Sequence, residues 1–210
     1  EKSISYNKIM QSTNLLINTL INTNEDFLLN RLLTILAKQS YIEGKITLAS
    51  GKESNYYVDC KQTTLHHEGN TLISYIFSRM LKPNVQAVGG LTMGADPLAT
   101  GVSQMAYLLQ GKNIDAFYVR KEPKKHGRSL WIEGPITPGS KVTILEDVVT
   151  TGGSSIKAIE KVQEFGCTVE QVLSIVDRNE GGRELYKDKG FDYDYIFDID
   201  EIIAKAKSLS

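Results

Sequence analysis

An acidic pair stands directly before a glycine-rich segment in residues 142–155, VTILEDVVTTGGSS. The segment is apolar up to Glu146 and Asp147, and two carboxylates at a strand end need water, a metal or hydroxyl groups because buried unpaired charge is very costly. Gly152 and Gly153 let the backbone approach a ligand closely. A helix that begins here offers unpaired N–H groups and the positive end of its dipole to an anion. The segment predicts a phosphate cradle beside two carboxylates.

A ribose 5-phosphate is one molecule that needs both features of this segment. Its phosphate would lie in the loop, and its 2′ and 3′ hydroxyls would face Glu146 and Asp147. These acids could also offset positive charge that develops on the sugar ring. The alternative is an ordinary strand–helix turn, which a Gly-Gly pair alone would favour. The sequence has neither the G-x-x-x-x-G-K-[ST] pattern of P-loop sites nor the G-x-G-x-x-G pattern of dinucleotide sites.

The run I-L-E-D-V-V-T-T-G-G-S resembles the signature with which type I phosphoribosyltransferases bind 5-phosphoribosyl-1-pyrophosphate (PRPP). That signature is long and specific. The resemblance implies that the chain binds PRPP through a consecutive set of residues: Glu146, Asp147, Val148, Val149, Thr150, Thr151, Gly152, Gly153 and Ser154.

Residues 120–128, RKEPKKHGR, hold five Lys or Arg residues and His126 in a chain whose formal net charge is −1. Pro123 and Gly127 disfavour a stable helix. By itself such a run is best interpreted as a solvated surface loop. Beside a PRPP site, its cations could stabilise the departing pyrophosphate, and the histidine could donate a hydrogen bond or a proton. A lid that closes would also exclude water.

The pattern V-R-K-E-x-K-x-H-G resembles the catalytic loop of orotate phosphoribosyltransferases. The resemblance implies that four side chains contact pyrophosphate or PRPP: Arg120, Lys121, Lys124 and His126. Lys124, His126 and Asp147 are the expected catalytic residues. In that family the loop reaches the active site of the neighbouring subunit, so the resemblance also implies a homodimer.

Arg178 follows the apolar run of residues 172–176 and is expected near the carboxyl-terminal edge of a sheet. A guanidinium can pair bidentately with the carboxylate of orotate, although a surface arginine paired with a neighbouring acid is the alternative. The segment S-G-K-E-S-N-Y-Y-V-D resembles one that packs over the base in the orotate enzymes. By this resemblance Tyr56, Tyr57 and Val58 lie near orotate, and Thr150 and Arg178 contact it. Strand packing is the alternative for the two tyrosines.

The turn G-G-L-T-M-G-A-D-P resembles the pyrophosphate-binding loop of the family, with two departures. Thr92 and Met93 stand where some members have Tyr-Lys, and Ala49 stands where some have Lys. Two cationic contacts are therefore absent, although backbone N–H groups near Thr92 and Met93 can still bind pyrophosphate. His66 and His67 have no metal-ligand spacing and are interpreted as surface or helix-capping residues.

The elements that must position these residues follow a β–α alternation, which implies a parallel sheet covered on both faces, with ligands beyond the carboxyl ends of its strands. The pattern predicts strands at residues 85–90, 115–119, 141–149, 169–176 and 193–199, and helices at 97–109, 155–164 and 68–81. A helix starts at Glu25 and ends before Gly44. Residues 46–60 form two extended pieces around a Ser-Gly turn. The resemblance implies the type I phosphoribosyltransferase α/β fold with a small hood of N-terminal segments.

Length and composition limit the number of domains, the kinds of partner and the cellular location. The chain has 210 residues, of which 41% are hydrophobic and 23% charged, so one domain over 1–210 is expected, with 1–24 as a helical appendage. The near-neutral charge favours neither nucleic acid nor an anionic membrane as a partner. Cys60 and Cys167 are far apart, which favours a reducing compartment. No apolar run spans a bilayer and no secretory signal precedes the domain, so a cytoplasmic location is expected.

The resemblance covers residues 25–200 and implies transfer of the 5-phosphoribosyl group from PRPP to orotate, giving orotidine 5′-monophosphate and pyrophosphate in pyrimidine biosynthesis. No cluster resembles a metal cage, so Mg²⁺ is expected to arrive with PRPP. A transferase for a purine or uracil is the nearest alternative, and Arg178 argues against it. A regulatory protein that binds PRPP without chemistry is another, and the intact basic loop argues against it. A fused decarboxylase barrel of roughly 250 residues is excluded by length.

Overall fold

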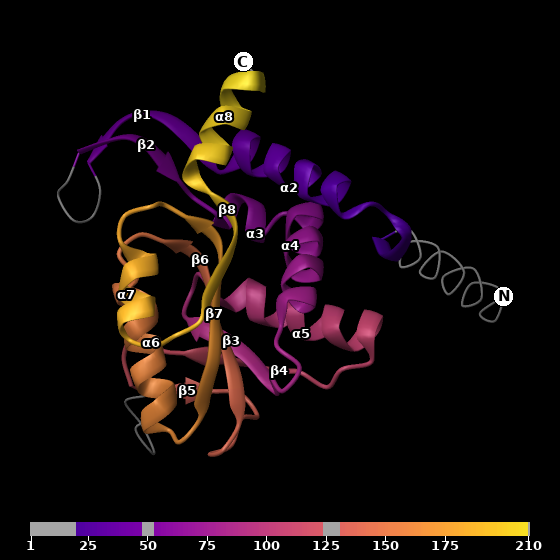
Figure 1. Cartoon of the computed structure of the whole chain (residues 1–210), viewed down its shortest axis with the longest axis vertical. Helices are drawn as coiled ribbons and strands as arrows, with labels where there is room; N and C mark the ends of the chain where they lie inside the picture. Colours follow the sequence, from indigo (N-terminus) through magenta and orange to yellow (C-terminus); the bar gives the residue numbers. More distant parts are fainter. Residues whose placement is uncertain (1–19, 48–52, 124–130, 210) are drawn as a thin grey trace, which may run out of the picture.

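The fold centres on a six-stranded sheet (Figure 1) in a computed structural model that describes residues 20–47, 53–123 and 131–209. The strand order is β5-β4-β3-β6-β7-β8. Five strands are parallel, and β5 pairs antiparallel with β4 at the edge. The strands are β3 (Ala87–Leu91), β4 (Asp115–Val119), β5 (Ile132–Glu133), β6 (Lys141–Val149), β7 (Thr168–Asp177) and β8 (Tyr193–Asp198). This confirms the α/β class and the mostly parallel sheet.

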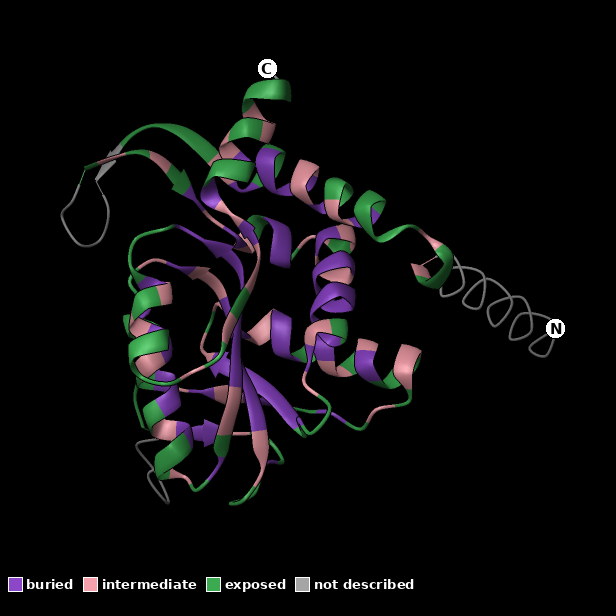
Figure 2. Ribbon diagram, viewed as in Figure 1, coloured by how far each residue is buried: buried purple, intermediate pink, exposed green. Residues whose placement is uncertain are grey.

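Helices cover both faces of the sheet. Because adjacent residues of a central strand point to opposite faces, each central strand contributes side chains to the core on both sides. In β6, Leu145 packs into the core under α2, α4 and α5, whereas Ile144 packs into the core under α6. Figure 2 shows the central strands of the six-stranded sheet mostly buried and the outer helix faces exposed. The helices are α2 (Glu25–Gln39), α3 (Lys61–Thr64), α4 (His67–Met80), α5 (Asp96–Gln110), α6 (Gly153–Glu164), α7 (Gly182–Asp188) and α8 (Ile199–Leu209). No described helix has the length and apolarity needed to cross a bilayer.

Strands β6 and β7 end together, and this sets the position of the site. Their parallel register pairs Val149 with Asp177, the last residue of each strand. The loop that starts at Thr150 and the turn that starts at Arg178 therefore leave the sheet side by side. The acidic pair lies within β6, just before this edge.

A hairpin of β1 (Tyr41–Thr47) and β2 (Glu53–Val58) forms a separate two-stranded antiparallel sheet that projects from the body (Figure 1). It is the hood that the sequence predicted from the N-terminal segments. The chain returns from it through Asp59, whose N–H donates to the Ser40 carbonyl at 2.9 Å. The Ser40 hydroxyl in turn bonds the Thr63 hydroxyl at 2.7 Å. These bonds anchor the base of the hairpin to α2 and α3.

Helix α2 ends several residues before Gly44, the glycine that was expected to follow it. It starts at Glu25, after the Asn24 side chain that accepts from the Asp26 N–H at 2.7 Å, and it ends at Gln39. Gly44 does not follow the helix end but lies inside β1 with φ of 148°. The polar contacts of Ser40 turn the chain before the glycine is reached. The helix therefore starts at Glu25 and ends before Gly44, as predicted, but it is Ser40 and not the glycine that caps its end.

The predicted capping role of His66 is confirmed. The ring nitrogen Nδ1 of His66 accepts from the Gly69 N–H at 3.3 Å, so His66 caps α4. Gly166 takes φ of 98° just beyond the end of α6, the left-handed conformation that a glycine after a helix supplies at little cost. Cys60 and Cys167 are buried free thiols.

Candidate active site

Glu146 is a buried carboxyl group on β6, only 6% exposed. It bonds the Ser155 side chain, which also accepts from the Tyr186 hydroxyl at 2.7 Å. Its Oε1 atom has no hydrogen-bond partner among the described residues. Burial raises the pKa of Glu146 to about 8, and the charge of Asp147 adds to that rise. Glu146 is therefore largely protonated near neutral pH.

Asp147 faces the turn between β3 and α5. Its Oδ1 atom accepts from the Val148 N–H at 2.9 Å. Burial raises the pKa of Asp147, opposed by that N–H and by the Lys61 ammonium. A Cβ atom at Gly94 would lie 2.8 Å from Asp147 Oδ1, so only glycine lets this turn approach the carboxylate so closely. The acidic residue of β6 and the predicted pyrophosphate loop thus form one site.

The loop after β6 encloses a cavity of about 280 Å³. The helix α6 follows from Gly152, which has φ of 77°, and it has neither a capping side chain nor an acidic residue in its first turn. The N–H groups of that turn are therefore available to an anion. The cavity is lined by Val148, Val149, Thr150, Thr151, Gly152, Gly153, Ser154, Ser155 and Lys157. The lining includes the residues of the predicted phosphate cradle from Val148 to Ser154, together with Lys157.

The turn before α7 supports this loop from behind. A Cβ atom at Gly182 would lie 2.4 Å from a methyl group of Val149 and 3.0 Å from the Thr150 carbonyl oxygen. The Tyr186 ring lies 3.2 Å from where a Gly152 Cβ would be. Two glycines thus permit the close packing that holds the loop against α7.

Arg178 places a buried cation beside the loop. Its side chain is 7% exposed, its backbone N–H donates to the Val149 carbonyl at 2.9 Å, and its guanidinium lies 4.9 Å from the centre of the Tyr56 ring. One terminal nitrogen pairs with Glu180 at 2.9 Å. The Nε atom has no hydrogen-bond partner among the described residues. The site can therefore accept a further carboxylate at this guanidinium.

The predicted base-binding tyrosines separate in the structure. Tyr56 stacks under Arg178 and also lies 6.1 Å from the Tyr41 ring. Tyr57 is 37% exposed, and neighbouring residues of a strand point to opposite faces, so it does not share the face of Tyr56. Val58 is buried in the core. The structure brings Tyr56 to Arg178, but not Tyr57.

The described part of the basic loop borders the same site. Arg120 bonds Glu133 at 3.3 Å, and its backbone N–H donates to Trp131. Arg120 and Lys121 border a cavity of about 330 Å³ together with Thr92, whose N–H donates to the end of β4. These two cations therefore lie beside the turn that faces Asp147. The predicted residues Lys124, His126 and Ala49 lie outside the described residues.

Comparison with known proteins places this geometry in a family. Residues 61–207 match the phosphoribosyl transferase domain. The chain is 42% identical to the orotate phosphoribosyltransferase of Nostoc sp. over 85% of its own length and 87% of the relative. It is 45% identical to that of Thermosynechococcus vestitus, over 82% and 92%. This chain belongs to the orotate phosphoribosyltransferase family.

Solved orotate phosphoribosyltransferases share the fold. The enzyme of Mycobacterium tuberculosis in complex with Fe(III) dicitrate is 36% identical with a TM-score of 0.74, over 83% of this chain and 98% of that one. The same enzyme has been solved with PRPP, at 34% identity and a TM-score of 0.71 over the same shares. The match extends to the Aeropyrum pernix enzyme at 27% identity and a TM-score of 0.65, over 84% and 99%.

Two site residues of this orotate phosphoribosyltransferase were not predicted from sequence. Lys157 lies in the second turn of α6, where a cation opposes the helix dipole unless an anion binds there. A lysine this close to the amino-terminal end of a predicted helix was the available sequence signal for an anion site. Glu180 gave no comparable signal, because a carboxylate two residues after an arginine is common on protein surfaces. Only the structure shows that Glu180 pairs with one terminal nitrogen of the Arg178 guanidinium.

Glu146→Gln should stabilise the orotate phosphoribosyltransferase increasingly as pH rises. The pKa of Glu146 in the folded protein is raised from 4.5 to about 8. Between about pH 4.5 and pH 8 the unfolded protein ionises this residue more readily than the folded protein does, so the free energy of unfolding falls as pH rises. Glutamine carries no such cost. The shift corresponds to an upper bound of about 5 kcal/mol, so the Tm advantage of the variant should grow by about 5 °C or more between pH 5 and 8.5. Thermal unfolding at both pH values measures it.

Glu184→Gln is the control for this measurement, since Glu184 is an exposed residue of α7. Its Tm difference from wild type should stay constant between the two pH values. A Glu146→Gln difference that also stays constant would show that the buried carboxyl ionises normally in the folded protein.

Proposed function

We propose that this chain transfers the 5-phosphoribosyl group of PRPP to orotate at the edge where β6 and β7 end. The observation that carries the proposal is the buried Arg178 guanidinium. It is stacked on Tyr56, its Nε has no hydrogen-bond partner among the described residues, and it lies directly beside the phosphate cradle. A phosphorylated sugar and a planar acid fit these two neighbouring positions. The bond from C1′ to the pyrophosphate oxygen breaks, and the bond from C1′ to a ring nitrogen of orotate forms. The proton that this nitrogen loses passes to pyrophosphate or to water.

The phosphoribosyl group would bind along β6 and the loop after it. Its 5′-phosphate lies in the cradle of Thr150, Thr151, Gly152, Gly153 and Ser154, with Lys157 adding a cation. The ribose hydroxyls lie against the acidic pair. Protonated Glu146 can donate a hydrogen bond to a hydroxyl, whereas Asp147 supplies negative charge. That charge stabilises the positive character that the ring gains as pyrophosphate leaves.

Orotate would lie between the hood and the end of β7. Its carboxylate pairs with Arg178, where it meets the free Nε and competes with Glu180 for the guanidinium. Tyr56 covers the base, and Thr150 contacts it from the loop. Tyr57 and Val58 belong to the same hairpin segment and act through its placement over the base. The selection for orotate over uracil then rests on one charged contact.

Pyrophosphate would leave toward the basic loop. Arg120 and Lys121 lie beside Thr92, so the diphosphate would lie against these two cations. The Thr92 N–H already donates to the Val119 carbonyl, so a backbone contact from this turn would come from the neighbouring Met93 N–H. Lys124 and His126 complete this set as the catalytic members of the loop. Lysines there act as point charges on the departing group, and the histidine donates a hydrogen bond or a proton.

Mg²⁺ is the metal that this family uses, and we propose that it arrives bound to PRPP. No three described carboxylate, histidine or cysteine groups converge into a metal-binding cluster. The Asp147 carboxylate and the Glu146 carboxyl group, whose Oε1 has no hydrogen-bond partner among the described residues, fit a cation held mainly by substrate phosphates and water. Bound in this way, Mg²⁺ would offset the charge of the pyrophosphate.

Calorimetry separates this mode of Mg²⁺ binding from a protein-built site. MgCl₂ titrated into the protein alone should give little heat, whereas the same titration with PRPP present should give clear binding. EDTA should abolish turnover. Tight stoichiometric binding of Mg²⁺ to the bare protein would contradict a metal delivered by substrate.

The activity itself is tested by the ultraviolet absorbance of orotate, which falls as the base is consumed. Purified protein with PRPP and Mg²⁺ should deplete orotate and produce orotidine 5′-monophosphate and pyrophosphate in equal amounts. Pyrophosphate release without loss of orotate would indicate PRPP hydrolysis instead, and would reject the transfer.

We propose further that the enzyme is a homodimer whose residues 120–128 reach the site of the neighbouring subunit. One inactive variant carries both Lys124→Ala and His126→Ala and therefore has a defective loop. A second inactive variant, Asp147→Asn, has a defective cradle. After subunit exchange about half of the dimers should be hybrids. Each hybrid holds one fully wild-type site, so about a quarter of all sites should regain activity. Steady-state turnover of the mixture measures this.

The control is each variant exchanged with itself, which should stay inactive. A loop that serves its own subunit leaves one defect in every site, so the mixed sample would then stay inactive as well. No gain of activity after demonstrated exchange would reject the shared site.

Domain extent and location complete the proposal. We assign the whole chain to one phosphoribosyltransferase domain, with residues 1–24 as an N-terminal appendage that lies mostly outside the described residues. The two cysteines are buried free thiols, which supports a reducing compartment such as the cytoplasm.

A further inference from the structure

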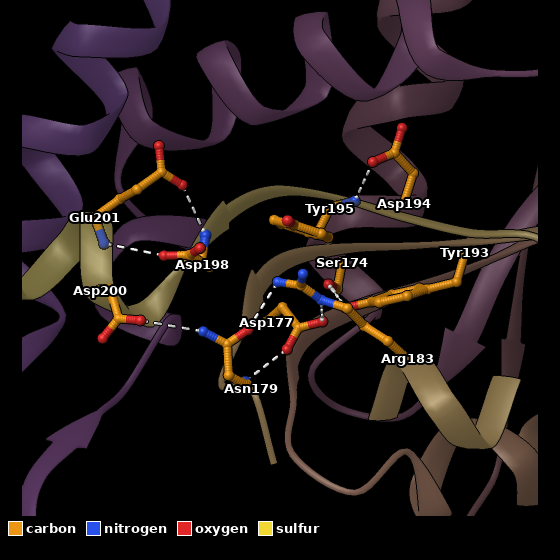
Figure 3. Close-up of polar contacts among 10 residues, drawn as sticks. All are labelled: Ser174, Asp177, Asn179, Arg183, Tyr193, Asp194, Tyr195, Asp198, Asp200 and Glu201. Carbon is orange, nitrogen blue, oxygen red and sulfur yellow. Dashed lines mark hydrogen bonds and ion pairs between the residues drawn. The ribbon is translucent and has the colours of Figure 1, made fainter. Parts of the chain in front are cut away.

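The turn that carries Arg178 is held by residues on either side of it (Figure 3). Asp177, the last residue of β7, is completely buried. Its carboxylate accepts from the Asn179 N–H at 2.7 Å and from Arg183 Nε at 2.8 Å. A buried carboxylate is tolerated only when such partners satisfy it. The two bonds therefore define where β7 ends and how the turn begins.

Asn179, on the other side of Arg178, has a backbone conformation that is uncommon for its type. It is the non-glycine residue with positive φ, 56°, in the described parts of the chain. Its side-chain oxygen accepts from a terminal nitrogen of Arg183 at 2.8 Å, and its side-chain nitrogen donates to Asp200 at 3.3 Å. Asparagine tolerates this region better than most residues, and these bonds hold it there.

Arg183 is the one side chain in this network that bonds both neighbours of Arg178. Its guanidinium bridges the Asp177 carboxylate and the Asn179 amide and lies 4.2 Å from the centre of the Tyr195 ring. Figure 3 shows it lying between the end of β7 and the strand β8. A planar fork with several donors can make both bonds at once, which a lysine cannot.

We propose that Arg183 is a positioning residue for orotate: by bridging Asp177 and Asn179 it fixes the direction of the Arg178 side chain toward the base. This inference rests on the proposed function, because it takes Arg178 as the ligand of the orotate carboxylate. Arg178 is additionally tied to the phosphate loop through its own N–H to Val149 at 2.9 Å. With the backbone fixed on both sides, its buried guanidinium keeps one orientation over Tyr56.

A double-mutant cycle on orotate KM tests this role. Arg183→Ala should raise orotate KM about tenfold or more, and should change kcat and PRPP KM by less than about threefold. In an Arg178→Ala background, adding Arg183→Ala should change orotate KM no further, because its only route to the substrate is gone. A direct ligand or a general structural residue would instead raise KM by the same factor in both backgrounds, and that result would overturn the proposal.

Two additional variants keep the test decisive. Arg183→Lys retains a charge beside Asp177 but cannot bridge to Asn179, so it should fold if Arg183→Ala does not, and it should keep part of the KM defect. Wild-type KM in a folded Arg183→Lys would also contradict the proposal. Arg79→Ala is the matched control: Arg79 also lies over a tyrosine ring, at 5.7 Å, and pairs with a carboxylate, at 3.6 Å from Glu25. It should leave orotate KM unchanged.

The single variants distinguish a wrong orotate site from a wrong role for Arg183. If Arg178→Ala by itself leaves orotate KM unchanged, the orotate site of the proposed function is wrong. If Arg178→Ala raises KM but the effects of the two substitutions are additive, only the positioning role of Arg183 is wrong.

Discussion

Asp147→Asn is expected to lower kcat for orotidine 5′-monophosphate formation by roughly 100-fold or more, the scale of losing one preorganised electrostatic contact to a transition state. Asp147 lies in β6 beside the turn at Gly94. In the proposed function the departing pyrophosphate and the ribose ring would meet there. Glu146 cannot replace its charge, since burial keeps that carboxyl mostly protonated near neutral pH. The asparagine keeps the shape of the side chain, so the loss reports the charge.

Steady-state kinetics with PRPP and orotate both varied will measure this effect. The charge acts on a ring that becomes positive only as the C1′ bond breaks, so kcat should fall more than PRPP KM rises. Asp115→Asn, at the exposed start of β4, is the control and should leave both constants unchanged. An Asp147→Asn enzyme with normal kcat and a raised PRPP KM would make Asp147 a binding residue only.

Arg178→Ala is expected to raise orotate KM by about 100-fold and to remove most of the preference for orotate over uracil. A hydrogen-bonded charge pair contributes about 1.5–3 kcal/mol, which is roughly 10- to 150-fold in binding. The guanidinium is 7% exposed, so water does not replace the lost partner easily. In the wild-type enzyme, uracil would leave the buried cation with Glu180 alone, which penalises uracil strongly.

The two substrates must be compared in the same variant. Wild type should use uracil at least about 1000-fold less efficiently than orotate by kcat/KM, and Arg178→Ala should bring the two within about tenfold. Arg79→Ala should behave as wild type. An Arg178→Ala enzyme that keeps the full orotate preference would move base selection to another residue.

The sequence predicted the central strands well because their signal is strong. Strands β4 and β6 have the predicted bounds, 115–119 and 141–149. Both are short apolar runs between polar turns, as expected for strands buried on two faces. Strand β3 starts two residues later than predicted, at Ala87. Strand ends depend on hydrogen-bonding neighbours, which a single sequence does not reveal.

The elements that were missed have weak or unused signals. The two-residue strand β5 is an edge pairing that depends on β4. The seven-residue helix α7 buries few side chains, so it lacks an apolar stripe. Helix α8 had a usable signal: Asp198 and Glu201 cap it reciprocally, with bonds of 3.1 and 2.9 Å. That D-x-x-E spacing is a variant of the capping box.

Site residues that are contiguous in the sequence could be predicted from the motif alone. Site residues that meet only through tertiary contacts could not. The acidic pair and the loop to Ser154 are contiguous, so the motif identified them together. Tyr56 and Arg178 are far apart in sequence, and a likeness to a family was needed to bring them to one base. That Glu146 is protonated could not be predicted, because Glu-Asp in a sequence carries no sign of which carboxyl is buried.

The most direct test of the account is turnover of orotate against uracil, adenine and hypoxanthine by the wild-type protein with PRPP and Mg²⁺. The account predicts that orotate alone is consumed at a substantial rate, with one pyrophosphate released per orotidine 5′-monophosphate. Equal turnover of orotate and uracil would contradict the role of Arg178 as the residue that selects the base. Consumption of a purine with orotate untouched would contradict the proposed function as a whole.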